Sequence, residues 1–262
     1  SSFKKFALNS KLLLTNYDCQ ITRKNIKSKL QWSNKETKKT KFSLIPNIVN
    51  KTNTFAKYYE NGNYIDTLKI PIPGLHNLSN ITASIAASRI IGVSFQDIKE
   101  NIQYLKLPKK RFEFRGIFNE RIIYDDYAHH PNEIKATINL AKLFINNNHR
   151  EKEEGRLIVI FQPHRFSRVK QFINEFAEEL SKADVIFVTN IFGAGELNKD
   201  KIHSENLTDI IYKKNKNVQY LKDNYEIKKN FYNLTQRRDF IVNMGAGNCH
   251  NLWSILNNSQ DR

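Results

Sequence analysis

At 262 residues the chain can form one large domain or two modest ones, and its 40% hydrophobic content is compatible with a packed core. Its longest dense apolar stretch, 157–161, is far shorter than the ~20 residues of a membrane span. No basic and then apolar leader precedes that stretch, so we expect a cytoplasmic protein. Cys19 and Cys249 lack the spacing of metal ligands, so the sequence suggests neither a disulfide framework nor a zinc site.

The formal net charge of +16 could indicate a nucleic-acid partner, because clustered Lys and Arg release counterions from phosphate backbones. The excess is concentrated in residues 1–108, which hold 17 basic and 6 acidic side chains, against 25 and 20 in residues 109–262. These lysines are scattered among Asn, Thr and Ser, without the Arg and aromatic residues on which bases stack. We therefore favour a solvated basic surface, with a basic nucleic-acid-binding module as the alternative.

The first part of the chain reads as extended structure followed by helices. Residues 1–70 are expected to form short strands between polar, Lys-rich loops, and the best candidates are 11–15, 41–45 and 64–70. The segment 71–74, with two prolines and a glycine, ends the extended part. Helical spacing of apolar residues follows in Ile81, Ile85, Ala86 and Ile90. A second helix is expected to begin at Ser94, whose hydroxyl can cap it together with Asp97.

Pro108 and the three basic residues after it mark a domain boundary, which predicts domains at 1–108 and 109–262. Beyond it, 112–118 and 121–125 are expected to form a hairpin, and strands then alternate with helices. The strands are expected at 157–161, 185–189, 218–221 and 240–244, and the helices at 131–147, 167–182, 204–215 and 223–234. This alternation predicts an α/β fold whose mostly parallel sheet is covered by helices on both faces. The polar run 146–155 is expected to be an exposed loop.

Polar groups are concentrated where the hairpin ends and the next helix is expected to start. Residues 125–133 read Asp-Asp-Tyr-Ala-His-His-Pro-Asn-Glu, and Pro131 suits the first turn of that helix. Because parallel sheets bind ligands where strands end and helices begin, we interpret this segment as part of a ligand site. The alternative is that Asp126 caps a turn and that both His residues are partly buried spacers.

A second polar segment, 161–168, reads Phe-Gln-Pro-His-Arg-Phe-Ser-Arg and again joins a strand to a helix. Arg165 and Arg168 are three residues apart, so they share a face near the positive end of the helix dipole. Cations are unfavourable at that end without an anion, and the pair therefore predicts an anion site. The alternative is that the two arginines pair with surface carboxylates such as Glu175 or Glu178.

Three further segments are less specific. The glycine-containing segments 193–196 and 245–248 follow apolar strands, where glycines serve a turn as readily as a ligand. Asn77 and Asn80 are three residues apart at the start of a helix. They could present their amides to one planar partner or cap the helix.

Together these segments resemble the Mur ligase family in content and order, from about Gly74 to Asn248. Residues 76–80 are similar to the family's HNxxN element, 111–113 to its domain-entry Arg, and 125–133 to its DDYxHHPxE element. Residues 161–168 are similar to the FQPHRxxR of members that add L-alanine to UDP-N-acetylmuramate, whereas murein tripeptide ligases carry an FEPR-like segment. The resemblance favours L-alanine addition, with a murein tripeptide ligase as the alternative.

The resemblance implies an ATP-dependent, amide-bond-forming ligase of peptidoglycan synthesis. In such ligases ATP phosphorylates the muramic carboxylate, and the alanine amine attacks the acyl phosphate through a tetrahedral anion that cationic groups stabilise. It implies that the adenine and ribose of ATP are contacted by Asn77, Asn80, Arg111 and Asp126. It also implies that the muramoyl and alanine groups face Tyr127, His129, His164, Arg165 and Arg168.

The sequence departs from the family in its phosphate-binding elements. None of its nine glycines is followed by Lys, and none belongs to a GxGxxG pattern, so both phosphate-binding loops of the family are missing from this sequence. The ligands that the family uses for Mg²⁺ also lie upstream of the matched region. Residues 1–108 are therefore expected to be the C-terminal half of the family's α/β ATPase domain. Residues 109–262 are expected to be its complete Rossmann-like, amino-acid-binding domain, and the chain alone is expected to be inactive.

Overall fold

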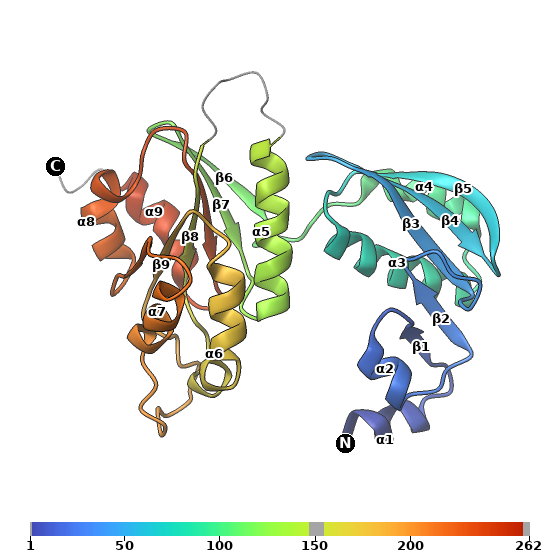
Figure 1. The fold of residues 1–262 in the computed structure, drawn as a ribbon. Coiled ribbons are helices and arrows are strands. Elements are labelled where there is room, and N and C mark those ends of the chain that lie inside the picture. Colours follow the sequence, from blue (N-terminus) through green and yellow to red (C-terminus); the bar gives the residue numbers. More distant parts are fainter. Residues whose placement is uncertain (1, 147–154, 259–262) are drawn as a thin grey trace. The chain divides into compact units, whose positions relative to one another are not determined.

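The structure is a computed structural model that describes residues 2–146 and 155–258, so most of the loop expected at 146–155 lies outside the described residues. The chain divides into two compact units, Ser1–Lys106 and Leu107–Arg262, which are coloured blue to green and green to red in Figure 1. Each unit has its own sheet and is described by itself.

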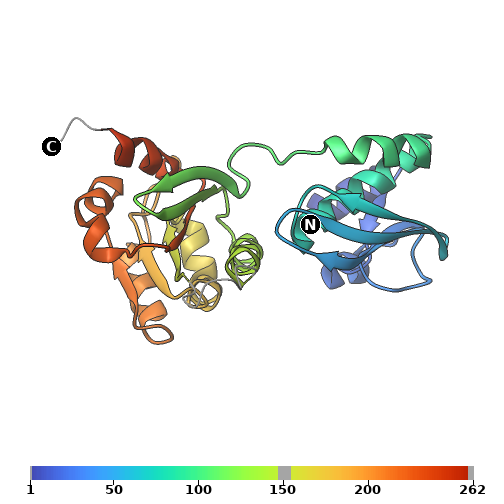
Figure 2. The same ribbon diagram turned by 90° about the horizontal axis from the view of Figure 1, so that it is seen from above.

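The first unit is built on a five-stranded sheet with the order β1-β2-β3-β4-β5 (Figures 1 and 2). The first three strands run parallel, and the last three are joined as antiparallel neighbours. The strands are β1 (Leu14–Asn16), β2 (Leu30–Ser33), β3 (Phe42–Val49), β4 (Thr54–Glu60) and β5 (Asn63–Ile70). The helices are α1 (Ser2–Asn9), α2 (Gln20–Asn25), α3 (Leu75–Ile90), α4 (Phe95–Asn101) and the 3-10 helix η1 (Ile102–Tyr104).

The expectation that residues 1–70 contain only strands and loops is wrong for α1 and α2. Both helices are short, and α2 buries none of its side chains, so their sequences hold too few buried positions to indicate a helix. The two later helices are confirmed. The buried residues of α3 recur at helical spacing, as Leu78, Thr82, Ile85 and Ala86. Ser94 caps α4, because its hydroxyl accepts a hydrogen bond of 3.0 Å from the backbone N–H of Asp97.

The second unit confirms the predicted mostly parallel sheet, whose order is β10-β9-β8-β11-β7-β6. Among the strands that the structure describes in this sheet, only β6 runs antiparallel to its neighbour, as the expected hairpin requires. The strands are β6 (Glu113–Phe118), β7 (Arg121–Asp126), β8 (Leu157–Phe161), β9 (Val185–Val188), β10 (Val218–Tyr220) and β11 (Phe240–Met244). The helices are α5 (Pro131–Asn146), α6 (Phe166–Leu180), α7 (Ser204–Tyr212), α8 (Asn224–Leu234), α9 (Leu252–Asn257) and the 3-10 helix η2 (Cys249–Asn251).

Helices cover both faces of this sheet because the central strands are apolar on both sides. In β8, Leu157, Val159 and Phe161 pack in the core that includes residues of α5, α6 and α7. Ile158 and Ile160 point the other way, into the core shared with α8 and α9. All five side chains of β8 are buried, which is why this strand reads as an unbroken apolar run in the sequence.

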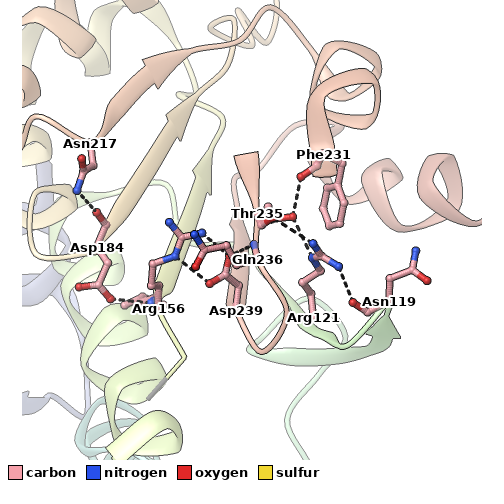
Figure 3. A network of polar contacts seen from close by, with 10 residues as sticks. Asn119, Arg121, Arg156, Asp184, Asn217, Phe231, Thr235, Gln236 and Asp239 are labelled. Atoms are coloured by element: carbon pink, nitrogen blue, oxygen red, sulfur yellow. Dashed lines mark hydrogen bonds and ion pairs between the residues drawn. The ribbon is translucent and has the colours of Figure 1, made fainter. Parts of the chain in front are cut away.

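Polar contacts close the edge of the sheet at which the parallel strands begin (Figure 3). Arg121, 7% exposed, donates to the side chain and the carbonyl of Thr235, at 3.0 and 3.1 Å, and to the carbonyl of Asn119 at 2.6 Å. Arg156 holds Asp239 through two hydrogen bonds of 3.0 and 2.8 Å. A cation at the carboxyl end of α8 is favourable, and this network ties the hairpin to that helix.

Among the described residues, none of the helices combines the length and the apolar character that crossing a membrane requires.

Candidate functional site

The candidate site lies at the opposite edge of the second unit's sheet, where the parallel strands end. β8 and β11 are neighbours, and Phe161 pairs with Met244 at their ends. After these ends the chain diverges, because α6 lies in the helix layer with α5 while α9 lies in the layer with α8. A divergence of this kind opens a crevice at the ends of two adjacent strands, which is where open α/β sheets bind ligands.

The carboxylate of Asp126 organises the loop that follows β7. Its Oδ2 accepts a hydrogen bond from the backbone N–H of Phe112 at 2.7 Å. Its Oδ1 accepts from the N–H of Ala128 at 2.8 Å and from the hydroxyl of Thr137 at 3.1 Å. Burial raises the pKa of Asp126, although these hydrogen bonds and the nearby Arg111 oppose the shift. The turn-capping alternative therefore describes Asp126 well, and three of its roughly four lone pairs accept these hydrogen bonds.

Tyr127 and His129 lie together beyond Asp126, with ring centroids 5.3 Å apart. His129 Nδ1 is 2.8 Å from the carbonyl of Tyr127 and 3.3 Å from the carboxylate of Glu133, which fixes the orientation of the imidazole. The guanidinium of Arg111 lies over the Tyr127 ring at 5.9 Å. His130, in contrast, packs against Phe172 with ring centroids 4.9 Å apart, so the spacer alternative fits this second histidine.

His164 joins this group from the loop after β8, and its ring centroid is 5.6 Å from that of His129. Arg168 lies one turn along α6, and its Nη1 is 3.1 Å from Nδ1 and 3.3 Å from the carbonyl of His164. Burial, followed by the positive charges of Arg168 and neighbouring cations, lowers the pKa of His164. The imidazole is therefore neutral at pH 7, with Nδ1 placed to accept from Arg168.

Arg165 faces a protein carboxylate that the sequence did not single out. Its Nη1 lies 3.7 Å from Oε1 of Glu196, in the loop after β9. The same carboxylate accepts hydrogen bonds from the backbone N–H of Ser167 at 3.1 Å and from its hydroxyl at 2.7 Å. The anion at the start of α6 is thus Glu196, while Glu178 pairs with Lys214 instead. Arg165 is half exposed, so its guanidinium also faces solvent.

Asn77 and Asn80 belong to the first unit, in the first two turns of α3. Neither caps the helix, because the N-cap is Gly74, with a φ of 95° that favours glycine. The amide of Asn77 donates to the carbonyl of Pro73 at 2.8 Å, and the amide of Asn80 lies 3.5 Å from the His76 ring. The Asn80 side chain is exposed, so its amide can reach a partner.

Asp125 is a buried carboxylate on the opposite face of β7 from Asp126. It accepts a hydrogen bond of 3.0 Å from the amide of Asn243, and Arg115 Nε lies 3.4 Å from Oδ2, which has no hydrogen-bond partner in the described structure. Burial raises the pKa of Asp125 to about 6. Since the folded state then binds a proton more tightly than the unfolded state, stability falls as the pH rises from about 4 to 6.

We expect Asp125→Asn to stabilise the protein at pH 7.5, because the amide removes a buried charge that costs about 3 kcal/mol. The gain should shrink by about 2 kcal/mol between pH 7.5 and pH 4.5, where the folded parent is protonated at this position. Thermal midpoints of the parent and the variant across this pH range measure both effects. An advantage that did not change with pH would show that Asp125 titrates normally.

The described residues contain no group of three or more His, Cys, Asp or Glu side chains that could hold a metal ion. Sequence reasoning also missed Glu196 and the carboxamide of Gln162, which is buried between β8 and β11. Glu196 could have been found from the sequence, because it ends the segment 193–196, which was interpreted only by its glycines.

Comparison with known proteins agrees with this geometry. The sequence model described as "Mur ligase, glutamate ligase domain" matches residues 110–247. A curated relative, the UDP-N-acetylmuramate–L-alanine ligase of Prochlorococcus marinus subsp. pastoris, is 67% identical over 260 residues, covering 98% of this chain and 55% of the relative. The chain therefore spans about half the length of the curated relatives that it matches.

Two solved structures share the fold. The UDP-N-acetylmuramate–alanine ligase MurC from Thermotoga maritima has a TM-score of 0.75 at 22% identity, over 97% of this chain and 53% of that one. The MurF ligase from Thermotoga maritima in complex with ADP has a TM-score of 0.64 at 17% identity, over 93% of this chain and 52% of that one. These likenesses confirm the α/β class. Because the sequence match at residues 110–247 spans more than half of the chain, the protein belongs to the Mur ligase family.

Proposed function

We propose that the chain is the carboxyl-terminal part of an ATP-dependent, cytoplasmic ligase that joins L-alanine to UDP-N-acetylmuramate in peptidoglycan synthesis. The observation that carries the proposal is the meeting of two motif segments at one sheet edge, with His129 and His164 5.6 Å apart and Arg168 beside His164. The name of the relative that is 67% identical supports L-alanine as the amino acid. A murein tripeptide ligase and a nucleic-acid-binding module are not favoured by the comparisons.

In this proposal each part of the chain corresponds to one domain of the ligase, and both contribute residues that contact ATP. Residues 1–108 are the C-terminal half of an ATPase domain, and residues 109–262 are the amino-acid-binding domain. Asn77 and Asn80 offer amides to the adenine base, Arg111 its guanidinium, and Asp126 its remaining lone pair to a ribose hydroxyl. Mg²⁺ would act on the phosphates, and we assign none of its ligands to the described residues.

ATP supplies the phosphoryl group that activates the muramic carboxylate. The residues of this chain bind and orient the reacting groups. Tyr127, His129 and His164 form one wall for the muramoyl and alanine groups. Arg165 and Arg168 provide positive charge toward the substrate carboxylates and toward the oxyanion that forms when the amine attacks. A neutral His164 can share this wall with two arginines without adding a third positive charge.

A hybrid ligase tests the proposal, with the upstream part of the Prochlorococcus relative joined to residues 1–262 of this chain. We expect the hybrid to release ADP only when both UDP-N-acetylmuramate and L-alanine are present. The chain alone should release none, because positioning and neutralising the phosphates supplies most of phosphoryl-transfer catalysis.

The intact relative is the positive control, and a murein tripeptide offered in place of L-alanine tests the other amino-acid substrate. A folded hybrid that used the tripeptide and ignored L-alanine would show that the specificity is misassigned. If the hybrid folded but was inactive with L-alanine and with the tripeptide, while the intact relative was active, the ligase assignment itself would be contradicted.

A further inference from the structure

We propose that Gln162 is a positioning residue, whose carboxamide fixes the 245–248 loop against the turn that carries His164. The inference rests on the proposed function for its link to catalysis. Its structural part, the anchoring of one loop by one side chain, stands on the contacts of this chain alone.

The backbone places Gln162 at the point where the two strands separate. Its N–H donates to the carbonyl of Met244 at 2.9 Å, one residue beyond the last paired position of β8 and β11. Beyond this bond the chain after β8 enters α6 and the chain after β11 enters the 245–248 loop. The side chain of Gln162 is buried between them, at 9% exposure.

The carboxamide bridges to the loop with both of its ends. Nε2 donates to Oδ1 of Asn248 at 2.7 Å, and Oε1 accepts from the backbone N–H of Cys249 at 3.1 Å. A carboxamide offers a donor and an acceptor side by side at neutral pH, which the carboxylate of Glu cannot. The carbonyl of Cys249 is held as well, because it accepts from the amide of Asn243 at 2.8 Å. The end of the loop is therefore fixed on both sides of one residue.

The glycines of the loop lie against Gln162, where a larger residue would not fit. A Cβ on Gly247 would lie 2.3 Å from Oε1 of Gln162 and 2.6 Å from the ring of Phe192. A Cβ on Gly245 would lie 2.9 Å from Sγ of Cys249, and 3.0 Å from both the Cβ and the backbone carbonyl oxygen of Gln162. The segment needs glycine because it packs directly on Gln162, so the loop and the carboxamide form one packed unit.

Phe192 connects the packed loop and carboxamide to His164, which belongs to the proposed substrate wall. The Phe192 ring lies where a Cβ on Gly247 would clash with it. The same ring stacks on His164, with ring centroids 5.6 Å apart and an interplanar angle of 17°. Its carbonyl accepts from the N–H of Arg165 at 2.8 Å. A shift of the 245–248 loop would therefore be transmitted to the positions of His164 and Arg165. We infer that Gln162 acts through these residues and not by touching the substrate.

Gln162→Glu is the sharpest test, because a protonated Glu keeps one donor and one acceptor whereas an ionised Glu has no donor for Asn248. In residues 1–262, we expect hydrogen exchange of the Cys249 N–H at pH 7 to be about tenfold or more faster in Gln162→Glu than in the parent. The amide NMR signals of Gly247 and Cys249 should move back toward the parent positions as the introduced carboxylate is protonated. The same pH titration of the parent measures how much these signals move because of the nearby charged groups, which are Asp125, Glu113, Lys110, Arg115 and His250.

The hybrid ligase then tests the catalytic part. We expect Gln162→Glu to lower kcat/KM for L-alanine by about ten- to a hundredfold at pH 8, since small displacements of positioning groups have effects of that size. Relative to the parent hybrid at each pH, the loss should shrink as the pH is lowered and the introduced carboxylate, whose pKa burial raises, becomes protonated. Gln219→Glu, the same change at an exposed position of β10, should leave exchange and activity within about twofold of the parent.

Unchanged Cys249 exchange in Gln162→Glu would overturn the anchoring. Faster exchange with unchanged kcat/KM would show that the loop position does not matter to the reaction, and the positioning role would be withdrawn. An inactive parent hybrid would count against the ligase proposal, and the exchange measurement would still decide whether Gln162 anchors the loop.

Discussion

Asp126→Ala is expected to lower the free energy of unfolding of residues 107–262 by about 3 kcal/mol or more. The carboxylate accepts three hydrogen bonds, from the N–H groups of Phe112 and Ala128 and from the hydroxyl of Thr137. Alanine would leave all three donors without their acceptor in a buried place, and each such donor costs about 1–3 kcal/mol. Removing a carboxylate whose pKa is raised by burial returns part of this loss, so the three penalties do not add in full.

Denaturant unfolding of the whole chain measures the effect. Tryptophan fluorescence reports on both units, because Trp253 lies in the second unit and Trp32 in the first. Trp32→Phe in both parent and variant isolates the second unit's signal. Asp200→Ala is the matched control, because Asp200 is half exposed and pairs only on the surface with Lys170, so its loss should change stability by less than about 1 kcal/mol. If Asp126→Ala unfolded at the same denaturant concentration as the parent, the carboxylate would not be what holds this loop.

Most of the second unit could be predicted from the sequence, because its central strands are apolar on both faces and its longer helices carry one buried stripe each. The short η2 and α9 were not predicted. The expected strands 157–161 and 240–244 coincide with β8 and β11, and the helices α5 to α8 were expected to within three residues at each end. The first unit was harder to predict from the sequence. α1 and α2 are short and bury little or nothing, so residues 2–25 offer too few helical turns for an apolar repeat to distinguish a helix from a loop.

Within the site, the two motif segments could be placed together because parallel strands end at the same edge of a sheet. Contacts between distant residues could not be predicted. Glu196 reaches Ser167 across 29 residues of sequence, and Asp126 reaches the N–H of Phe112 across 14. Such pairs depend on loop conformations, including the positive φ of 69° at Arg165, that no local pattern specifies.

The other large effect is expected for Arg168→Lys in the hybrid ligase, which should lose about 2–4 kcal/mol of transition-state stabilisation in kcat/KM, a range typical of one preorganised oxyanion donor. Arg168 contacts Nδ1 and the carbonyl of His164 through Nη1, at 3.1 and 3.3 Å. Its other guanidinium nitrogens can then grip an anionic oxygen in the same plane.

A Lys ammonium can replace the contact with His164 or the contact with the anion, but it lacks the planar fork that makes both at once. The thermal midpoint should hardly move, because the charge is kept and the side chain is only partly buried at the start of α6. Lys170→Arg, the reverse change at an exposed position of the same helix, should alter neither quantity. If Arg168→Lys kept kcat/KM within a few-fold of the parent hybrid and lowered the midpoint by several degrees, Arg168 would be a structural partner of His164. The anion would then have to be bound by Arg165 alone, which in this structure already faces Glu196.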